Sequence, residues 1–338
     1  MRAVPPRSLK LRLVLTLSLL GACTTSPRIE GAGGDGGSNN AGGTGGKMSN
    51  GGAGGMGKPP APLGMGGAGG DGGSGGMPIT GFTPAVTGGW KLGPEVMGEV
   101  PPTGVSNEGK TCDALVAVVR DFKGVDDDGH PDFQAYEGDT PTTGLVAELL
   151  GGDRKPVYAS KCELGNVTGT CPWGPQTTSK KDFDQWYRFA DGVNKSYLLY
   201  FQFMTDANGQ ATFSSDRFFP LDGAGWGNSG EDEDMMSRNF GFTTELHTRF
   251  KYGGGETFSF TGDDDLWVFI NDRLALDLGG LHPQAMGTVD LDASAAMLGI
   301  EKGKVYSMDL FHAERHTNAS NFQVQTNFVF TDCGTVIK

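Results

Sequence analysis

After Thr111 the chain is dominated by short apolar runs and by alternating apolar and polar residues, which is the pattern of β-strands. Residues 114–119 form a continuous apolar run, and residues 322–330 alternate cleanly. Helical spacing is scarce in this part of the chain, with one candidate helix at residues 144–150. The other predicted strands are residues 197–203, 211–215, 240–250, 256–260, 266–270, 273–277 and 305–311.

Turn-forming residues separate these strands. Asn208-Gly209 is a strong tight-turn signal and predicts a hairpin between residues 197–203 and 211–215. Three glycines separate residues 240–250 from 256–260, and Asn271-Asp272 predicts a turn after the strand at 266–270. Many short strands with glycine-rich turns indicate an all-β sandwich or barrel.

The N-terminal residues 1–22 have the features of an export signal: four basic residues, an apolar run at residues 13–20, and small residues after it. The run is too short to span a bilayer, which takes about 20 residues. Leu20-Gly21-Ala22-Cys23 resembles a bacterial lipobox, which implies a lipidated Cys23 and, with Thr24 next, an outer-membrane or cell-surface lipoprotein. The alternative is an ordinary secretory signal, with Cys23 incidental.

Glycine supplies 23 of the 46 residues from Gly31 to Gly76, so this tract has almost nothing apolar to bury. We therefore expect residues 23–104 to be a disordered linker, in which about 55 flexible residues would span roughly 40 Å and tether the rest of the chain. Residues 105–338 are long enough for one sizeable core and are predicted to form a single β domain.

The net charge of −13 becomes −17 once the four basic residues of the signal are removed. An acidic exported chain suits cations, neutral sugars or basic partners, and it argues against binding to a nucleic-acid backbone. The chain also has no phosphate-binding glycine loop before a helix and no Gly-x-Ser-x-Gly nucleophile motif.

Four cysteines remain besides Cys23, and an even number in an exported protein favours disulfides. Three pairings exist. We expect Cys112–Cys333, which would join the two ends of the folded region, and Cys162–Cys171, which would close a short loop. A four-cysteine zinc site is the weaker alternative because no Cys-x-x-Cys spacing occurs.

One segment, Phe258-Ser-Phe-Thr-Gly-Asp-Asp-Asp-Leu-Trp-Val-Phe-Ile-Asn-Asp-Arg-Leu-Ala-Leu-Asp-Leu-Gly-Gly-Leu-His282, closely resembles the signature of bacterial fibro-slime domains. That family is similar in turn to the protective-antigen (PA-fourteen) type of β-barrel. The resemblance implies an antiparallel β-sandwich or barrel with long loops, in a superfamily that includes calcium-dependent carbohydrate-binding heads of adhesins. Further matching stretches bring the resemblance to residues 115–330: residues 120–122, 130–133, 218–222, 242–250 and 311–322.

Asp263, Asp264 and Asp265 are consecutive carboxylates at the entrance to a predicted strand, and they repel one another unless a cation intervenes. Calcium suits clustered aspartates. In the sugar-binding relatives an aspartate pair joined by a cis peptide binds calcium together with an asparagine of a later loop. The resemblance therefore implies Asp263 and Asp264 as calcium ligands, with Asn318 or Asn321. Asp265 is a further candidate ligand, although it stands where those proteins often have glycine. Without metal, the three aspartates would cap turns.

Open calcium positions would accept sugar hydroxyls, and an aromatic side chain would stack on the sugar. Trp226 is the first candidate and Trp173 the second, with ordinary packing as the alternative for each, whereas Trp267 is expected in the core. His312, Glu314 and His316 would share one strand face. A zinc or iron site there is a weaker interpretation than a hydrogen-bonded strand end.

Three functions follow. The first is a tethered, calcium-assisted adhesin or matrix protein that binds a polysaccharide or surface glycan, contacts the membrane only through its lipid and is not an enzyme. The second is a structural surface or slime protein that binds other proteins and no sugar. The third is a glycoside hydrolase, because two carboxylates drawn from Asp263, Asp264, Glu245 and Glu314 would supply an acid and a base.

Overall fold

The structure is a computed structural model that describes residues 80–99, 104–106, 112, 114–167 and 171–335. The predicted signal peptide, Cys23 and the glycine-rich tract lie outside the described residues. None of the helices in the described ranges is long and apolar enough to cross a bilayer.

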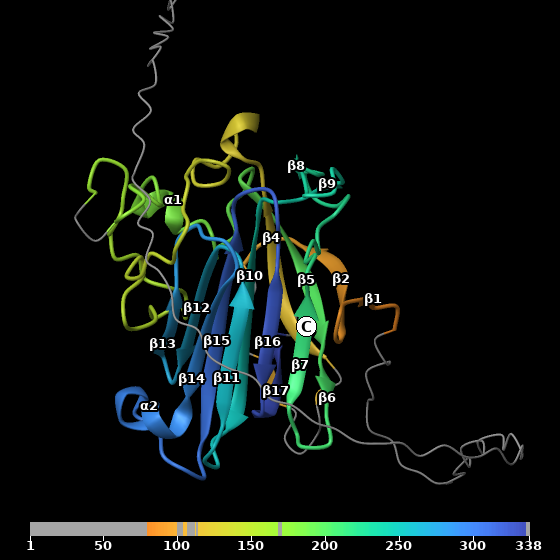
Figure 1. The fold of residues 1–338 in the computed structure, drawn as a ribbon, viewed down its shortest axis with the longest axis vertical. Helices are drawn as coiled ribbons and strands as arrows, with labels where there is room; N and C mark the ends of the chain where they lie inside the picture. Colours follow the sequence, from red (N-terminus) through yellow and green to blue (C-terminus); the bar gives the residue numbers. More distant parts are fainter. Residues whose placement is uncertain (1–79, 100–103, 107–111, 113, 168–170, 336–338) are drawn as a thin grey trace, which may run out of the picture. The chain divides into compact units, whose positions relative to one another are not determined.

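Strands dominate the described chain, as the sequence predicts (Figure 1). The helical elements are short: η1 (Val125–Asp127), α1 (Lys180–Phe183) and α2 (Leu291–Leu298). The strands are β1 (Thr83–Pro84), β2 (Gly89–Val96), β3 (Gly104–Ser106), β4 (Leu115–Phe122), β5 (Asn194–Gln202), β6 (Met204–Thr205), β7 (Ala211–Ser215), β8 (Gly230–Glu231), β9 (Ser237–Arg238), β10 (Phe242–Lys251), β11 (Thr257–Gly262), β12 (Asp265–Ile270), β13 (Arg273–Leu278), β14 (Ala285–Asp290), β15 (Val305–Glu314), β16 (Phe322–Thr326) and β17 (Val329–Thr335).

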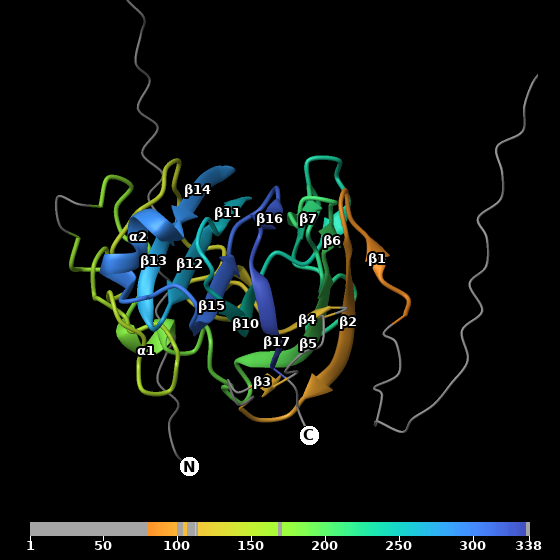
Figure 2. The same ribbon diagram turned by 90° about the horizontal axis from the view of Figure 1, so that it is seen from below.

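Two sheets pack face to face, which confirms the predicted antiparallel β-sandwich (Figure 2). The larger sheet has the order β1-β2-β5-β4-β17-β10-β15-β12-β13, with β3 added beside β17. The smaller sheet has the order β14-β11-β16-β7-β6, and β8 and β9 form a separate ribbon. Pairing between the described strands is antiparallel except where Gly334 of β17 meets Val116 of β4.

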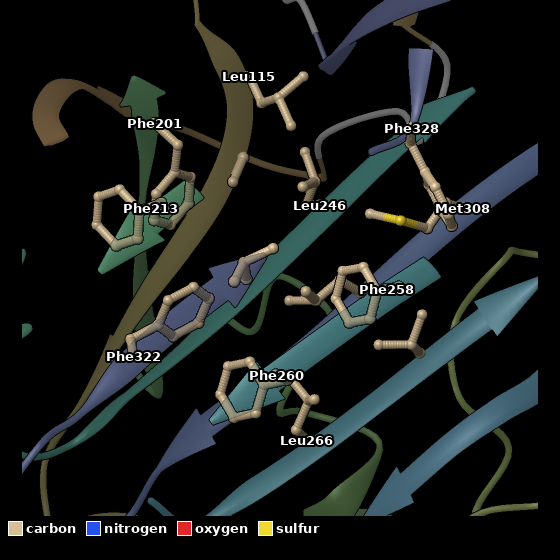
Figure 3. Packing of buried hydrophobic residues seen from close by; sticks show 14 of the residues in the cluster. Leu115, Phe201, Phe213, Leu246, Phe258, Phe260, Leu266, Met308, Phe322 and Phe328 are labelled. Atoms are coloured by element: carbon tan, nitrogen blue, oxygen red, sulfur yellow. The ribbon is translucent and has the colours of Figure 1, made fainter. Parts of the chain in front are cut away.

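The core between the sheets is rich in phenylalanine (Figure 3). Leu246 and Leu310 of the larger sheet face Phe258, Phe260 and Phe322 of the smaller one, and all five are at most 4% exposed. Each such side chain contributes roughly 2–3 kcal/mol by leaving water. The alternating apolar residues of β11 and β16 are therefore the inward face of a half-exposed sheet.

The other face of the larger sheet is also buried, because residues 123–193 fold over it; we call these residues the cover segment. Trp186 of the cover segment lies 6.3 Å from Trp267 of β12, between ring centroids. Phe269 and Phe311 belong to this second core. Burial on both faces explains why residues 266–270 of β12 are all apolar instead of alternating, and it confirms Trp267 as a core residue.

The predicted hairpin around Asn208-Gly209 is only partly correct. The turn is present, but it joins β7 to the two-residue strand β6, while β5 pairs with β4 and β2 in the other sheet. The chain thus changes sheets near Phe203. Residues 322–330 behave in the same way: the predicted single strand breaks after Thr326, so that β16 lies in the smaller sheet and β17 in the larger one.

Two other predictions need correction. Residues 144–150 are not helical, because the main-chain N–H groups of Ala147 and Leu150 bond to Val157 and Asp272 in neighbouring segments. Seven residues are too few for a helix that tertiary contacts oppose. The predicted linker of residues 23–104 extends too far, because β2 pairs along β5 and belongs to the β domain. The prediction extended the glycine-rich tract of residues 31–76 to residue 104, but Trp90 and Leu92 of β2 pack against the core.

Both expected disulfides are present. Cys112 and Cys333 are joined across 221 residues, with a Cα–Cα distance of 5.3 Å, and Cys162 and Cys171 close the short loop in the cover segment, at 5.4 Å. In the chain-entropy model the long loop contributes up to about 5 kcal/mol and the short one about 2 to 3 kcal/mol. The first disulfide also ties β17 to the segment that leads into β4.

Candidate functional site

An acidic cleft of about 520 Å³ lies where the chain passes from β11 in one sheet to β12 in the other. Only Asp263 and Asp264 connect the two strands, and the loop from β15 to β16 runs beside them. Gly262 permits this close approach, since a Cβ there would lie 2.5 Å from the Asn321 carbonyl oxygen. The cleft is lined by Tyr136, Glu137, Gly138, Glu233, Asp263, Asp264, Leu281, His282, Pro283, Gln284, His316, Thr317, Asn318, Ala319 and Asn321.

Asp263 is held by Asn321. Its Oδ2 accepts hydrogen bonds from the main-chain N–H and the side-chain amide of Asn321, both at 2.7 Å. The carboxyl is 5% exposed, and burial raises its pKa, with the nearby Glu233 adding to the effect. The structure thus places Asn321 beside Asp263, and the role of these two residues as metal ligands stays a prediction.

Asp264 is held by the start of the same loop. Its Oδ2 accepts hydrogen bonds from the main-chain N–H groups of Arg315, at 2.8 Å, and His316, at 3.0 Å. Burial raises the pKa of this carboxyl to about 6 even though Arg315 opposes the shift. In both carboxylates these amide contacts use Oδ2, and the Oδ1 atoms take no part in them.

The Asp263–Asp264 peptide is trans; among the peptide bonds between described residues, Thr317–Asn318 is the one in the cis form. Asp264 has a φ of 52°, which turns the chain sharply between the two carboxylates. Asn318 lies in the same cleft, is exposed, and accepts or donates no hydrogen bond among the described residues. Asp263, Asp264 and Asn318 are thus brought together as the sequence predicts.

Asp265 has a different role from the one predicted. Its Oδ1 accepts from the Gly280 main-chain N–H at 2.6 Å, and its Oδ2 accepts from Arg315 Nε, also at 2.6 Å. Asp265 and Arg315 are both fully buried, and Arg315 Nη1 donates to the Asp132 and Gln176 carbonyl oxygens of the cover segment. Because its oxygens are occupied in this way, Asp265 anchors the cover segment instead of facing the cleft.

Glu314, at the end of β15, is a buried acid whose carboxyl oxygens lack hydrogen bonds in the described structure. It is fully buried, and neither carboxyl oxygen has a hydrogen-bond partner there. Burial and the neighbouring Asp264 and Asp263 raise its pKa well above the usual value. Three acids close together without solvent require either protons or a cation.

The His312, Glu314, His316 interpretation is not supported as a metal site. His312 is fully buried, its ring lies 5.1 Å from the Phe322 ring, and burial lowers its pKa to about 3, so the imidazole is neutral. His316 lies in the cleft instead, with Nδ1 2.6 Å from the Thr317 carbonyl oxygen. Within the described ranges, His, Cys, Asp and Glu side chains form no ready group of three that would hold a metal on their own.

A calcium ion at Asp263 and Asp264 would therefore need oxygens of other types. Calcium also accepts amide and carbonyl oxygens beside carboxylates, usually six to eight oxygens in total. Asn318 and the main chain of the loop from 316 to 321 offer such oxygens on the same cleft. The orphaned carboxyl of Glu314 next to Asp264 also fits a nearby positive charge. The donor set is thus chemically suited to calcium.

The predicted tryptophans do not lie in this cleft. Trp226 lies in a separate groove with Lys123 and His130, and Trp173 is on the cover segment, where its Nε1 donates to Thr140 at 3.0 Å. The aromatic residue of the cleft is Tyr136, whose hydroxyl lies 2.6 Å from Thr178 Oγ1. Sequence reasoning missed Tyr136 because it lies more than 120 positions before Asp263, in a segment without regular structure.

Glu245, a candidate hydrolytic residue, lies in a buried charge network. Its carboxylate pairs with Arg120, at 2.6 Å, and with Lys155, and His247 Nε2 lies 2.5 Å from its Oε1. Along β15 the side chains alternate, so that Phe311 belongs to the core under the cover segment and Leu310 to the core between the sheets. Glu245 lies opposite Phe311, and Glu314 opposite Phe242 of the inner core. The two glutamates therefore point to opposite faces of one sheet.

The comparisons with known proteins agree with this architecture. Residues 190–335 match the model of the PA14 domain. Three Dictyostelium discoideum relatives are similar in sequence: protein psiD is 36% identical over 191 residues, psiJ 35% over 213 and psiN 34% over 235. The matches cover 56%, 59% and 64% of this chain, but only 36%, 29% and 30% of the relatives, so the chain spans about a third of their length.

Two solved structures align more loosely. One is a PA14 sugar-binding domain from an RTX adhesin, at 7% identity and a TM-score of 0.21 over 38% of this chain and 80% of that one. The other is the PA14 domain of an antifreeze protein, at 11% identity and a TM-score of 0.20 over 38% and 74%. From the matched residues and the fibro-slime motifs around Asp263, we conclude that residues 190–335 belong to the PA14 domain family, within a head of the fibro-slime type.

Proposed function

We propose that this chain is a cell-surface adhesin or matrix protein whose head binds a polysaccharide or surface glycan with the help of calcium. The coarser part of the proposal, a binding or adhesive role at the surface, has the support of the PA14 domain match and of the fibro-slime motifs around Asp263. The calcium, the sugar and the lipid anchor are the finer parts.

The observation that carries the calcium proposal is the arrangement of three acids. Asp263 and Asp264 share the cleft, and Glu314 is buried beside them without a partner. Burying several carboxylates together costs free energy unless they are neutralised. A divalent cation would supply that neutralisation and leave coordination positions for vicinal hydroxyls of a sugar.

The residues of the cleft would then orient the sugar. Tyr136 is half-buried, and its hydroxyl is held by Thr178, so its ring is a fixed surface on which a pyranose can pack. Glu137, Gln284 and Asn318 line the same cleft and can exchange hydrogen bonds with hydroxyl groups. Tyr136 thus replaces Trp226 and Trp173 as the proposed stacking residue of this site.

Glu245 and Glu314 point to opposite faces of the larger sheet, and this arrangement weighs against glycoside hydrolysis by the pair. Hydrolysis requires two carboxyls on either side of one bond, about 5 to 10 Å apart across a cleft. Glu245 is instead fixed by cationic partners under the cover segment. A structural slime protein that binds other proteins and no sugar is the second candidate, since the same sandwich presents large loops.

For the location we propose export and lipidation at Cys23, with residues between Cys23 and the head acting as the tether. The proposal rests on the lipobox-like Leu20-Gly21-Ala22-Cys23 and on the glycine content of residues 31–76. Labelling of the expressed protein with a radioactive fatty acid tests it: the label should be incorporated, and the change Cys23→Ser should abolish it.

The binding function is tested with a glycan array and with insoluble cellulose and chitin, each in calcium and in EDTA. We expect binding in calcium that EDTA abolishes or strongly reduces, and that Asp263→Asn and Asp264→Asn reduce in the same way. The matched control is Asp290→Asn, an exposed aspartate at the start of α2, which lies at the opposite end of β14 from the cleft. If calcium has no effect and no sugar binds, while cross-linking recovers a protein partner, the structural candidate is correct instead.

A further inference from the structure

A second groove, with a volume of about 450 Å³, surrounds Trp226 and shares no residue with the acidic cleft. It is built by the loop after β4, the chain that leads into β5, and the loop between β7 and β10. Trp226 is 38% exposed, which is unusual for a side chain of its size. The lining residues are Lys123, Asp127, Asp128, Gly129, His130, Pro131, Gln185, Gly192, Val193 and Trp226.

The loop that carries Trp226 is held in place by the buried Asp121. The main-chain N–H of Trp226 donates to Oδ2 of the buried Asp121, whose Oδ1 accepts from the Asn239 side chain at 2.7 Å. Gly225 has a φ of +61°, and a Cβ on it would lie only 1.8 Å from Asp121 Oδ2, so this contact requires glycine. Burial raises the pKa of Asp121 to about 6, while the hydrogen bonds from Asn239 and Trp226 lower it.

The indole ring is also fixed by charge. Lys195 Nζ lies 4.1 Å from the centroid of the Trp226 ring and donates to the Gly225 carbonyl oxygen at 3.0 Å. Lys123 Nζ lies 5.0 Å from the same centroid, is exposed and has no hydrogen-bond partner in the described ranges. One lysine therefore anchors the ring, while the other is a free side chain that can move aside for a ligand or bind it.

Other polar groups of the groove are unused as well. Within the described part of the chain, no hydrogen bond is made by the Trp226 indole N–H, the side-chain amide of Gln185 or the carboxylates of Asp127 and Asp128. The groove thus combines a flat aromatic surface with free donors and free acceptors. Sugar hydroxyls both donate and accept hydrogen bonds, so they match such a mixture. An ion of either sign matches it less well, because the positive charges of the lysines and the negative charges of the aspartates cancel.

We propose that the Trp226 groove is a second glycan-binding subsite, in which a sugar ring stacks on Trp226 without the help of a metal. The proposal rests on the proposed glycan-binding function, and it adds a site that needs no calcium. Lys123, Gln185 and Asp127 would bind the hydroxyl groups of the stacked sugar.

The two sites lie at the same end of the larger sheet. Asp121 of β4 pairs with Phe242 of β10, which pairs with Glu314 of β15, and Asp265 of β12 lies opposite Ala313. The groove and the cleft are therefore about three strand spacings, or roughly 14 Å, apart along the sheet. One polysaccharide chain can reach both, and two linked weak contacts give a stronger overall attachment than either alone.

The experiment compares binding of the purified full-length protein to cellohexaose, chitohexaose and maltohexaose, by calorimetry in EDTA and in calcium. In EDTA we expect residual binding to at least one hexasaccharide, which Trp226→Ala weakens at least about tenfold. Trp226→Phe should keep most of it. The matched control is Trp173→Ala, which removes an equally exposed tryptophan outside the groove. Thermal melts confirm that each variant is folded.

The outcomes separate the two proposals. Binding in calcium with none in EDTA overturns the second subsite and leaves the calcium site standing. Binding in EDTA that Trp226→Ala does not change overturns the assignment of the groove. The absence of sugar binding under both conditions overturns both proposals, and a protein cross-linked through a photoreactive residue at position 226 would then identify the groove as a protein contact.

Discussion

The Asp263 carboxylate accepts two hydrogen bonds from Asn321, one from its main chain and one from its side chain. This contact joins the turn between β11 and β12 to the loop that precedes β16. The two residues are 58 positions apart, and together they close one wall of the acidic cleft. Changes in this pair should therefore affect both the stability of the head and the shape of the proposed calcium site.

Asn321→Ala removes the amide donor to Asp263. Hydrogen bonds to charged groups contribute about 1.5 to 3 kcal/mol, so the free energy of unfolding should fall by about that amount. Urea unfolding measures it. Asn318→Ala is the matched control, because Asn318 lies in the same loop but is exposed and unpaired among the described residues. It should leave the stability unchanged and weaken only calcium binding; equal stability losses in both variants would contradict the distinction.

Glu245→Gln should destabilise the protein strongly. It leaves Arg120 and Lys155, which are at most 2% exposed, without their buried anionic partner, so that among the described residues only the exposed Glu99 still pairs with them, at 4.0 Å and 3.1 Å. Removal of one partner from a buried ion pair costs about 3 to 5 kcal/mol. Denaturant unfolding should show a loss of this size. Glu301→Gln, which breaks the exposed pair with Lys304, should have no measurable effect. A small loss in Glu245→Gln would show that water reaches the network.

The shifted pKa of His247 predicts that the free energy of unfolding depends on pH. Burial opposes its charged form, but Glu245 and Asp309, at 2.5 Å and 2.6 Å from its two ring nitrogens, raise its pKa above the usual 6.5. A raised histidine pKa gives stability that is complete below the unfolded pKa and is lost as pH rises through the folded pKa. The stability difference between the wild type and His247→Gln should thus be largest near pH 6 and shrink above neutrality. Urea unfolding from pH 6 to 9 measures it, and a difference that grows with pH would be contradictory.

The sequence predicted the strands well, and it predicted their sheet membership poorly. A period of two shows that residues 322–330 are extended. It does not show that the chain passes from the smaller sheet to the larger one near Phe328. The same limit explains the hairpin at Asn208-Gly209, since the turn residues specify the turn and not which strand pairs beyond Phe203. Both breaks are set by contacts across the core between the two sheets.

The acidic cleft was predicted where the family resemblance pointed to its residues. Asp263, Asp264 and the loop with Asn318 and Asn321 do meet, because β11 and β16 pair in register up to Gly262 and Phe322. Asp265 was grouped with the other two aspartates because it adjoins them, whereas its partner Arg315 is not part of the motif that the resemblance supplied. Nothing in the local sequence marks that buried pair, and the distant Tyr136 was missed for the same reason.

The central claim is tested most directly by a thermal melt of the purified protein at increasing calcium concentrations, compared with magnesium and EDTA. A ligand at a hundredfold excess over its Kd stabilises the folded state by about 2.7 kcal/mol, so calcium should raise the Tm by about 5 to 10 °C. The double variant Asp263→Asn/Asp264→Asn should show no such rise. A wild-type Tm that millimolar calcium leaves unchanged, or a rise that persists in the double variant, would contradict a calcium site in the acidic cleft.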